Sequence, residues 1–401
     1  MDESAKQKSV KLFAAVLIFV ALANGLGGSI LSNYFNEVYH ITSVQRGFLE
    51  VPRESPGVLC MVLVAALGFM GNLWMSVVSN VMVLIGLSVM GLMSPSYGVM
   101  LIFLFIQSMG NHLFMPLNDS ISMSLAEKGK EGATLGKFKS VTTTGAMAAA
   151  CMVFVGFRTG IFSFQAKVIR PFMLGCVFSI VAIILLCVMS RYYKGEETVK
   201  NHRLLFRKQY MPYYMTTLAY GCQKRIRIVF APWVVINLLE QGADTIALLT
   251  IAIHFIGSRV SPIIGRLLDR HGVKKMLWLE AGYIAVSFST LGLIAGMLAN
   301  GSLAKTGPKT WIVFAAYVFA VLFEQFGIVH SYMMRSIALD KSEVTRTLSV
   351  GISVDHIMAI IASPLLGLVW DRLGVQYVFY LAAASAVLQL AAAAMVKKQK
   401  V

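Results

Sequence analysis

The sequence predicts an all-α polytopic membrane protein, and three observations indicate this fold class. Hydrophobic residues make up 57% of the 401 residues and charged residues only 13%, a balance that excludes an ordinary soluble domain. Apolar runs of about 20 residues or more recur, each long enough to cross a hydrocarbon core about 30 Å thick as a helix. The runs lack the alternating pattern of membrane-barrel strands. Twelve transmembrane helices are expected, over residues 12–35, 44–70, 72–93, 97–125, 136–157, 169–190, 210–239, 244–266, 275–298, 310–337, 346–369 and 376–396.

The twelve helices are expected to form two six-helix bundles. The longest polar stretch, residues 191–209, follows the sixth helix and divides the chain into a bundle over 1–190, a cytoplasmic linker and a bundle over 210–401. The segment Arg53-Glu54-Ser55-Pro56 is echoed by Arg259-Val260-Ser261-Pro262. Such echoes are typical of transporters built from duplicated halves, and they support this division.

Lysine and arginine predict the orientation, because cytoplasmic loops retain positive charge during insertion. We expect a multi-pass protein of the cell membrane, the inner membrane of a bacterium, with both termini in the cytoplasm. The basic residues behind this prediction are Lys6, Lys8 and Lys11 before the first helix, Lys128, Lys130, Lys137 and Lys139 between the fourth and fifth, and Lys397, Lys398 and Lys400 after the last.

Several function classes are excluded at this stage. The formal net charge of +16 is what the insertion rule produces, so nucleic acid is not an expected partner. The five cysteines all fall within apolar spans, which argues against a disulfide framework or a zinc site. No Ser-His-Asp order or phosphate loop supports catalysis. We therefore expect no metal, no cofactor and no enzymatic activity, in a protein that is a monomer in the lipid bilayer.

One short loop between the eighth and ninth spans carries the sharpest motif. Residues 265–275 read Gly-Arg-Leu-Leu-Asp-Arg-His-Gly-Val-Lys-Lys. This order resembles the signature loop of the major facilitator superfamily, G-x-L-x-D-R-x-G-x-K-K. The resemblance implies two six-helix bundles that alternate in access, and a loop network that latches the outward-facing state. By that resemblance the latch residues are Gly265, Asp269, Arg270, Gly272 and Arg335.

The loop also has a mechanical rationale. Asp269 is placed where a helix N-terminus and basic side chains can stabilise a carboxylate, while Gly265 permits close approach and Gly272 a tight turn. The corresponding hairpin of the first half, residues 68–75, has neither the acid nor the basic residues. The latch is therefore expected in the second half alone, and no subfamily is identified.

Charged residues inside the seventh span are the strongest candidates for a binding site. Lys224, Arg225 and Arg227 lie about halfway along it, between Gly221 and Pro232. Ionisable groups deep in a bilayer cost about 2.5–3.5 kcal/mol each on insertion scales, so they are functional candidates by default. Lys224 and Arg227 project within about 60° of each other, and such a face could bind an anion. The alternative is internal ion pairing, with Glu324 or Asp355 as partners.

Other embedded polar residues extend the candidate site. On the second span Arg53 and Glu54 lie near one face together with Glu50, so they neutralise one another or Arg53 serves as a gate or substrate contact. Asn24 on the first span is a candidate polar contact to substrate. Buried carboxylates and histidines are candidate proton carriers, although permanent pairing with the helix-seven cations stays open for the carboxylates. The candidate carriers are Glu324, Asp355, His112 and His356.

These features predict a secondary active transporter that moves a small anionic or zwitterionic organic solute by alternating access. Proton coupling is a hypothesis based on the embedded carboxylates and histidines. The alternative is proton-driven efflux of amphipathic drugs, which requires that the cations be neutralised internally. A receptor is not expected, because no appended soluble domain fits in 401 residues.

Overall fold

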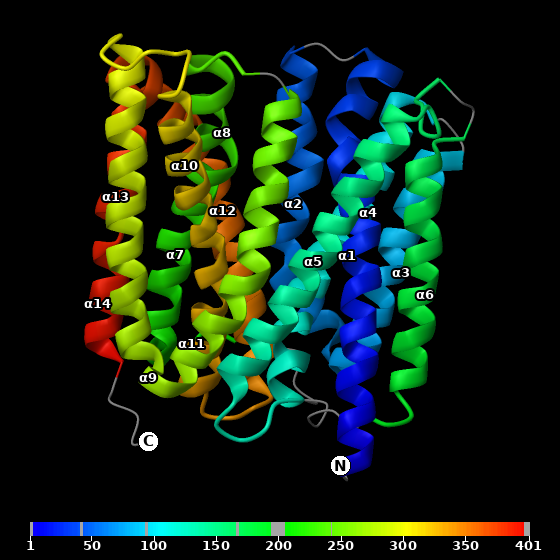
Figure 1. Ribbon diagram of the computed structural model, residues 1–401. Helices are drawn as coiled ribbons and strands as arrows, with labels where there is room; N and C mark the ends of the chain where they lie inside the picture. The colour runs from blue at the N-terminus through cyan, green and yellow to red at the C-terminus, as the bar shows by residue number, and fades with distance from the viewer. Residues whose placement is uncertain are drawn as a thin grey trace.

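A computed structural model of the chain describes residues 3–40, 43–92, 95–165, 168–193, 205–241 and 243–396. Most of the expected linker over 191–209 and the basic residues after 396 lie outside the described residues. The molecule is a bundle of roughly parallel long helices, and both chain termini lie at one end of it (Figure 1). We call this end the terminus end.

Six helices form the first half. Each corresponds to one expected span, because an apolar run of bilayer length satisfies its backbone hydrogen bonds only as a helix. The 3-10 segment η1 (Gly68–Met70) connects the second helix to the third. The helices are α1 (Glu3–Tyr39), α2 (Ser43–Leu67), α3 (Gly71–Leu92), α4 (Tyr97–Ser124), α5 (Glu131–Arg158) and α6 (Arg170–Met189).

The second half contains broken and merged helices. Residues 211–238, which we call helix seven, comprise α7 (Met211–Arg225), the π segment η3 (Ile226–Phe230), α8 (Ala231–Trp233) and the π segment η4 (Val234–Leu238), after the short 3-10 turn η2 (Lys208–Tyr210). Residues 310–337, which we call helix ten, comprise α10 (Thr310–Val321), the 3-10 segment η5 (Leu322–Phe326) and α11 (Gly327–Ile337). The remaining helices are α9 (Ala243–Ala299), α12 (Glu343–Arg372), α13 (Val375–Ser385) and α14 (Val387–Met395).

All twelve expected crossings have a counterpart. In the described part of the chain, nine helical stretches are long and apolar enough to cross a membrane. Two of these, Val51–Leu92 and Leu248–Ala299, each cover two expected spans, and helix seven is the remaining crossing. Inside α9 the backbone turns at Gly272, with φ of 73° and ψ of 167°, which joins the eighth and ninth crossings. Since α13 and α14 are consecutive, they form the twelfth crossing.

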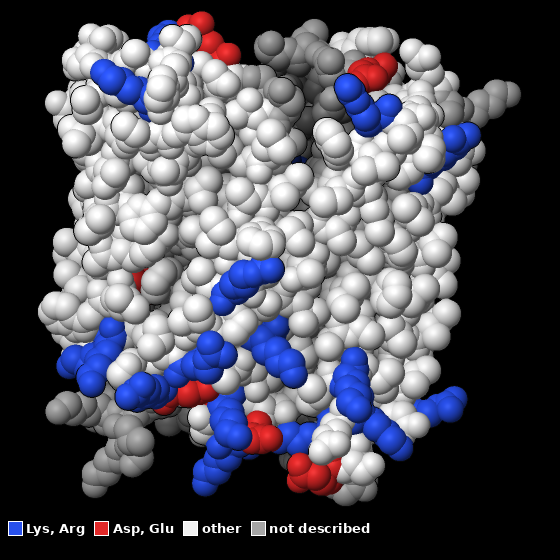
Figure 2. Space-filling view, in the orientation of Figure 1, with Lys and Arg blue, Asp and Glu red and all other residues white. Residues whose placement is uncertain are grey.

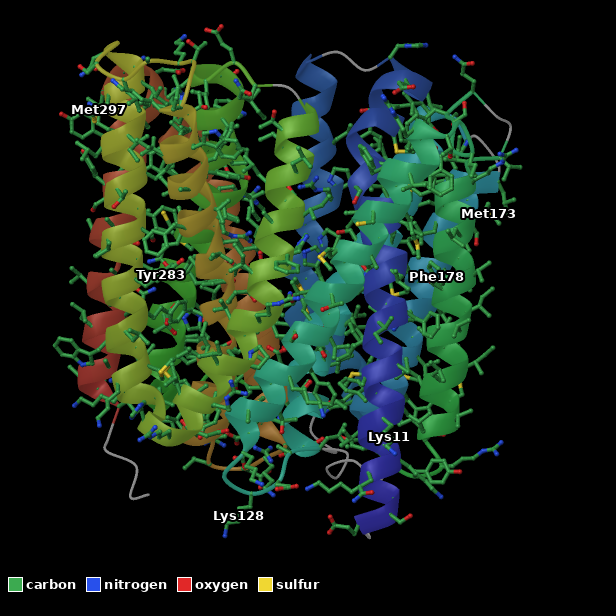
Figure 3. The ribbon with its side chains drawn as sticks, viewed as in Figure 1. Lys11, Lys128, Met173, Phe178, Tyr283 and Met297 are labelled. Atoms are coloured by element: carbon green, nitrogen blue, oxygen red, sulfur yellow. The ribbon has the colours of Figure 1, made fainter. Side chains whose placement is uncertain are left out.

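The first helix is longer than expected at its start. The prediction began at residue 12, whereas α1 begins at Glu3. Lys6 in the added turns donates from Nζ to the carbonyl oxygen of Ala126 at 2.8 Å. Lys11 and Lys128 both lie toward the terminus end, and Met173 and Met297 toward the opposite end (Figure 3). Lysine and arginine side chains gather toward the terminus end of the face in Figure 2, in line with the charge pattern of the sequence.

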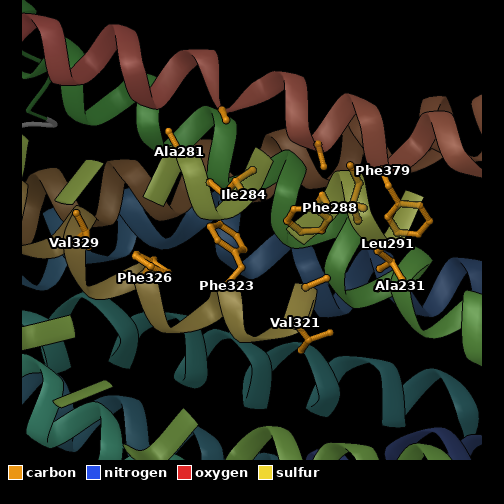
Figure 4. Close-up of a cluster of buried hydrophobic side chains, with 14 of the residues drawn as sticks. Ala231, Ala281, Ile284, Phe288, Leu291, Val321, Phe323, Phe326, Val329 and Phe379 are labelled. Carbon is orange, nitrogen blue, oxygen red and sulfur yellow. The ribbon is translucent and has the colours of Figure 1, made fainter. Parts of the chain in front are cut away.

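Packing between helices fills the interior of each half. In the second half Phe288 of α9, Phe323 of η5 and Phe379 of α13 are fully buried, and they lie in one apolar cluster (Figure 4). In lipid this packing contributes dispersion contacts rather than a hydrophobic driving force. Large apolar side chains such as Trp278 and Trp311 remain on the outer surface, as a lipid environment requires.

Candidate functional site

The candidate site lies where helix seven and helix ten both lose regular α-helical geometry. The π segment η3 begins directly after Arg225 and contains Arg227, and the 3-10 segment η5 contains Glu324. π segments occur often at functional sites, and irregular backbone at membrane depth is tolerated where it is buried in protein or lines a cavity. Broken helices also form binding sites in transporters. The two breaks therefore mark one region of the molecule.

An ion-pair cluster joins these breaks to the first half. Arg227 Nη1 lies 2.8 Å from Glu324 Oε2. Lys139 of α5 approaches the other oxygen of the same carboxylate, with Nζ 3.2 Å from Oε1. Because Lys139 belongs to the first half and Glu324 to the second, this cluster connects the two halves.

The other two helix-seven cations are also paired. Lys224 Nζ lies 2.6 Å from Asp355 Oδ2 on α12. Arg225 Nη2 lies 3.3 Å from Glu54 Oε2 on α2, and Arg53 Nη2 lies 3.4 Å from Glu54 Oε1. The Arg225–Glu54 pair crosses between the halves, so Glu54 is held by a cation from each half.

Two histidines complete the contact between α2, α4 and α12. His356 Nδ1 lies 2.8 Å from Glu54 Oε2. The rings of His112 and His356 meet edge to face, with centroids 4.3 Å apart. His112 Nδ1 lies 2.8 Å from the carbonyl oxygen of Ser108. The histidines thus place two imidazole rings beside one carboxylate at the boundary of the halves.

These pairs leave positive charge in excess. Among the described residues, three carboxylates contact five cationic side chains in this region. The Nε atoms of Arg225 and Arg227 are buried without a hydrogen-bond partner in the described part of the chain. A buried donor without a partner carries an energetic cost, so these two guanidinium groups keep capacity for an anion. The cluster comprises Glu54, Glu324 and Asp355 with Arg53, Lys139, Lys224, Arg225 and Arg227.

The structure contains the ion pairs of the alternative interpretation, since Asp355 and Glu324 hold Lys224 and Arg227. Substrate contact by these cations stays a prediction. On the second span Glu54 contacts Arg53, and it also contacts Arg225 and His356 of the second half. The side chain of Glu50 lies outside the described residues, so mutual neutralisation of the three stays a prediction.

Asn24 lies on α1, and its Oδ1 atom is buried without a hydrogen-bond partner among the described residues. Among the described residues its side chain makes no hydrogen bond to the ion-pair cluster, so its role as a polar contact to substrate also stays a prediction.

Two further acidic residues, Glu280 and Asp119, lie outside the ion-pair cluster. The sequence analysis missed the partner of Glu280 and misjudged the contact of Asp119. Glu280 of α9 is fully buried, and its Oε1 lies 2.9 Å from Nε2 of His330 on α11. The sequence signal that could have revealed this pair is the position of Glu280 inside the expected apolar span 275–298. Asp119 of α4 accepts a hydrogen bond from Ser331 of α11. The position of Asp119 near the cytoplasmic end of the fourth span predicts a helix-end or loop contact, whereas this bond joins two helices across the halves.

Comparison with known proteins identifies the fold. No protein-family model and no curated protein sequence matches the chain. The structure is similar to the proton:xylose symporter XylE of the major facilitator superfamily, with a TM-score of 0.75, 11% identity and coverage of 98% of this chain and 95% of that chain. The chain has the fold of the major facilitator superfamily.

Two further structures support this assignment. A bacterial homologue of the iron transporter ferroportin, in an outward-facing state, has a TM-score of 0.73 at 13% identity over 96% of this chain and 98% of that chain. The human organic anion transporter MFSD10 has a TM-score of 0.69 at 9% identity over 98% and 100% of the two chains. At such identities the similarity assigns the major facilitator fold and leaves substrate open.

The loop that resembles the major facilitator signature lies against the first half. The carboxylate of Asp269 accepts the backbone N–H groups of Gly132 and Ala133, each at 2.7 Å, at the N-terminus of α5. The amide groups and dipole of a helix N-terminus favour an anion. The expected helix N-terminus is therefore present and comes from the other half. Arg335 lies half-buried on α11 and Arg270 is exposed, and the role of all these residues as a latch stays a prediction.

Close packing extends along α5 and α9 from this loop. A Cβ atom at Gly265 would clash with the carbonyl oxygen of Gly132, and a Cβ at Gly136 would clash with that of Ser261. One turn further, Ser140 donates a hydrogen bond to the carbonyl of Ser258. We call this contact the α5–α9 seam, and it joins the two halves near the terminus end.

Proposed function

We propose that the protein is a secondary active transporter of a small organic anion or zwitterion, in a cell membrane with both termini in the cytoplasm. The observation that carries the proposal is the position of Arg225 and Arg227 at the break of helix seven, each with a buried Nε lacking a partner among the described residues. A guanidinium group binds a carboxylate or phosphate through two parallel hydrogen bonds.

Exchange of ion-pair partners links binding to movement in this proposal. Arg225 pairs with Glu54, and Lys139 pairs with Glu324, across the boundary of the halves. An entering carboxylate competes with Glu54 and Glu324 for the guanidinium groups. Because the Arg225–Glu54 pair fastens one half to the other, competition at Arg225 loosens the attachment of the halves and favours the rocking movement of alternating access.

The arrangement of the halves supports an outward-facing state. The α5–α9 seam closes the terminus end. Figure 2 shows the surface hollowed between the halves toward the opposite end. With cytoplasmic termini, the hollow is the entry path from outside, and a return to the inward-facing state requires the seam to open.

Glu324 is the coupling carboxylate in this proposal. It is held by Arg227 and Lys139 together, and it loses one of these cations when the solute takes Arg227. A proton then replaces the lost cation, which couples proton uptake to solute binding. The test is solute-driven alkalinisation outside proteoliposomes, which Glu324→Gln is expected to abolish while solute binding persists.

The binding site is tested by thermal stabilisation of the purified protein with a panel of carboxylates, zwitterions and lipophilic cations. At least one anion is expected to raise the unfolding midpoint by several degrees, and Arg227→Gln is expected to abolish the shift. Lys139 still neutralises Glu324 in this variant, so it is expected to fold. Arg259→Gln is the matched control, because Arg259 lies over the Phe255 ring and is exposed. An anion-induced shift that persists in Arg227→Gln would contradict the proposal.

Proton-driven efflux of amphipathic drugs is the second candidate. The observation that favours it is the pairing of all three helix-seven cations with carboxylates. Stabilisation by lipophilic cations alone, unchanged in Arg227→Gln, would replace the anion proposal with this one.

A further inference from the structure

Three potential metal ligands from three helices meet between the two halves. Glu54 of α2 and His112 of α4 come from the first half, and His356 of α12 from the second. Each offers one ligand atom, and these three atoms all lie within 4.8 Å of one another. The set is invisible in sequence, because the residues are far apart in the chain and follow no metal-binding spacing.

The hydrogen bond of His112 prepares its ring for a metal. Nδ1 lies 2.8 Å from the carbonyl oxygen of Ser108, and a carbonyl can only accept, so Nδ1 carries the hydrogen. In the neutral ring Nε2 then holds the free lone pair. Metal-binding histidines usually donate their other ring N–H in this manner, which orients the ring and raises its basicity.

The backbone of α2 allows the second histidine to approach. A Cβ atom at Gly57 would clash with the ring of His356, so only glycine lets this ring lie against α2. His356 is almost fully buried and reaches Glu54 through Nδ1 at 2.8 Å. Its Nε2 has no hydrogen-bond partner among the described residues. The geometry thus holds two imidazoles beside one carboxylate, with the His356 ring buried and the His112 residue partly buried.

We propose that Glu54, His112 and His356 bind one divalent transition-metal ion of the Zn²⁺ class. Two imidazoles and a carboxylate suit Zn²⁺, Co²⁺ or Ni²⁺, whereas Mg²⁺ and Ca²⁺ prefer oxygen ligands. The ion competes for Glu54 with Arg225 at 3.3 Å and with the Nδ1–H group of His356 at 2.8 Å, so both must release this carboxylate when the metal binds. Since the ligands belong to both halves, the ion fastens the halves together and arrests alternating access. This inference is independent of the substrate.

Cobalt binding by the purified full-length protein tests the site. After chelator treatment, Co²⁺ is titrated and followed by its visible absorption and by equilibrium dialysis. The expected result is one ion per chain, and His112→Gln and His356→Gln each weaken its binding at least tenfold. His254→Gln is the matched control, because His254 is a histidine of α9 outside the set. No binding, or binding that all three variants weaken equally, would overturn the proposal.

A cysteine variant distinguishes the loss of a metal ligand from a loss of Co²⁺ binding that is caused by misfolding. In His112→Cys a thiolate replaces one imidazole, and Co²⁺ is expected to add a sulfur-to-metal charge-transfer band that the parent protein lacks. This gain of signal requires the metal to lie at position 112. A bound cobalt ion without the new band would place the metal elsewhere and overturn the assignment.

Discussion

Two of the contacts between the halves are built from different chemistry. The α5–α9 seam consists of backbone groups and small residues, with Gly132 against Gly265 and Gly136 against Ser261. The contact of α2 with helix seven and α12 consists of ionisable side chains, with Glu54 between Arg225 and His356. Steric fit does not depend on solute or metal, whereas an ion pair can exchange partners. The difference suggests that the seam supplies rigidity and the ionic contact supplies control.

Removal of one charge from the ionic contact should have the largest effect. Glu54→Gln leaves Arg225 buried without this counterion, and breaking a buried pair costs about 3–5 kcal/mol. The measurement is the free energy of unfolding in denaturant. Adding Arg225→Met should restore most of the loss, because the double variant removes both charges. If the double variant is as unstable as Glu54→Gln, the Arg225–Glu54 pair does not govern this contact.

A side chain added to the seam should push the halves apart. Gly265→Val places a branched side chain against the Gly132 carbonyl, and overpacking costs about 1–3 kcal/mol. Distances between spin labels at Lys128 and Lys275, one on each half, are expected to lengthen and broaden. Gly282→Val, in the ninth crossing, is the matched control, because a Cβ at Gly282 meets nothing within 4 Å. Unchanged distances in Gly265→Val would show that the seam is not a steric closure.

Loss of the carboxylate at the end of the seam should have a smaller effect. Asp269→Asn removes the charge that the helix N-terminus of α5 stabilises, which is worth about 1–2 kcal/mol. The ratio of closed to open molecules at the terminus end is expected to fall about 5- to 30-fold, measured with the same pair of labels. An unchanged population would mean that the amide of asparagine satisfies the Gly132 and Ala133 N–H groups equally well.

The fold was predictable from the sequence because membrane helices are encoded locally. An apolar run of sufficient length specifies a crossing without knowledge of its neighbours. The break of helix seven was also foreshadowed by Gly221 and Pro232, which weaken helical hydrogen bonding. Its π geometry was not foreseeable, and neither was the way in which Arg225 and Arg227 reach carboxylates on other helices.

The partners of the charged residues were predictable only in part. Glu324 and Asp355 were expected as partners of the helix-seven cations, because they are acids inside the expected spans 310–337 and 346–369. The pairing of Glu54 with Arg225 depends on the rotation of α2 against helix seven, which sequence spacing does not encode. For Asp269 the sequence predicted a helix N-terminus but not which one, because backbone N–H groups carry no sequence signal; the partners are the amides of Gly132 and Ala133.

The π segments of helix seven also affect how this chain should be aligned with others. A π turn contains one more residue than an α turn, so each such segment accommodates a one-residue insertion. In an alignment without a gap, every later residue would be compared with one that points about 100° away around the helix. Helix seven has two such segments, Ile226–Phe230 and Val234–Leu238. A homologue with an ordinary α-helix here would be two residues shorter and would still present the same faces. Gaps placed in this helix would therefore be genuine, and a gap-free alignment would compare residues that face different neighbours.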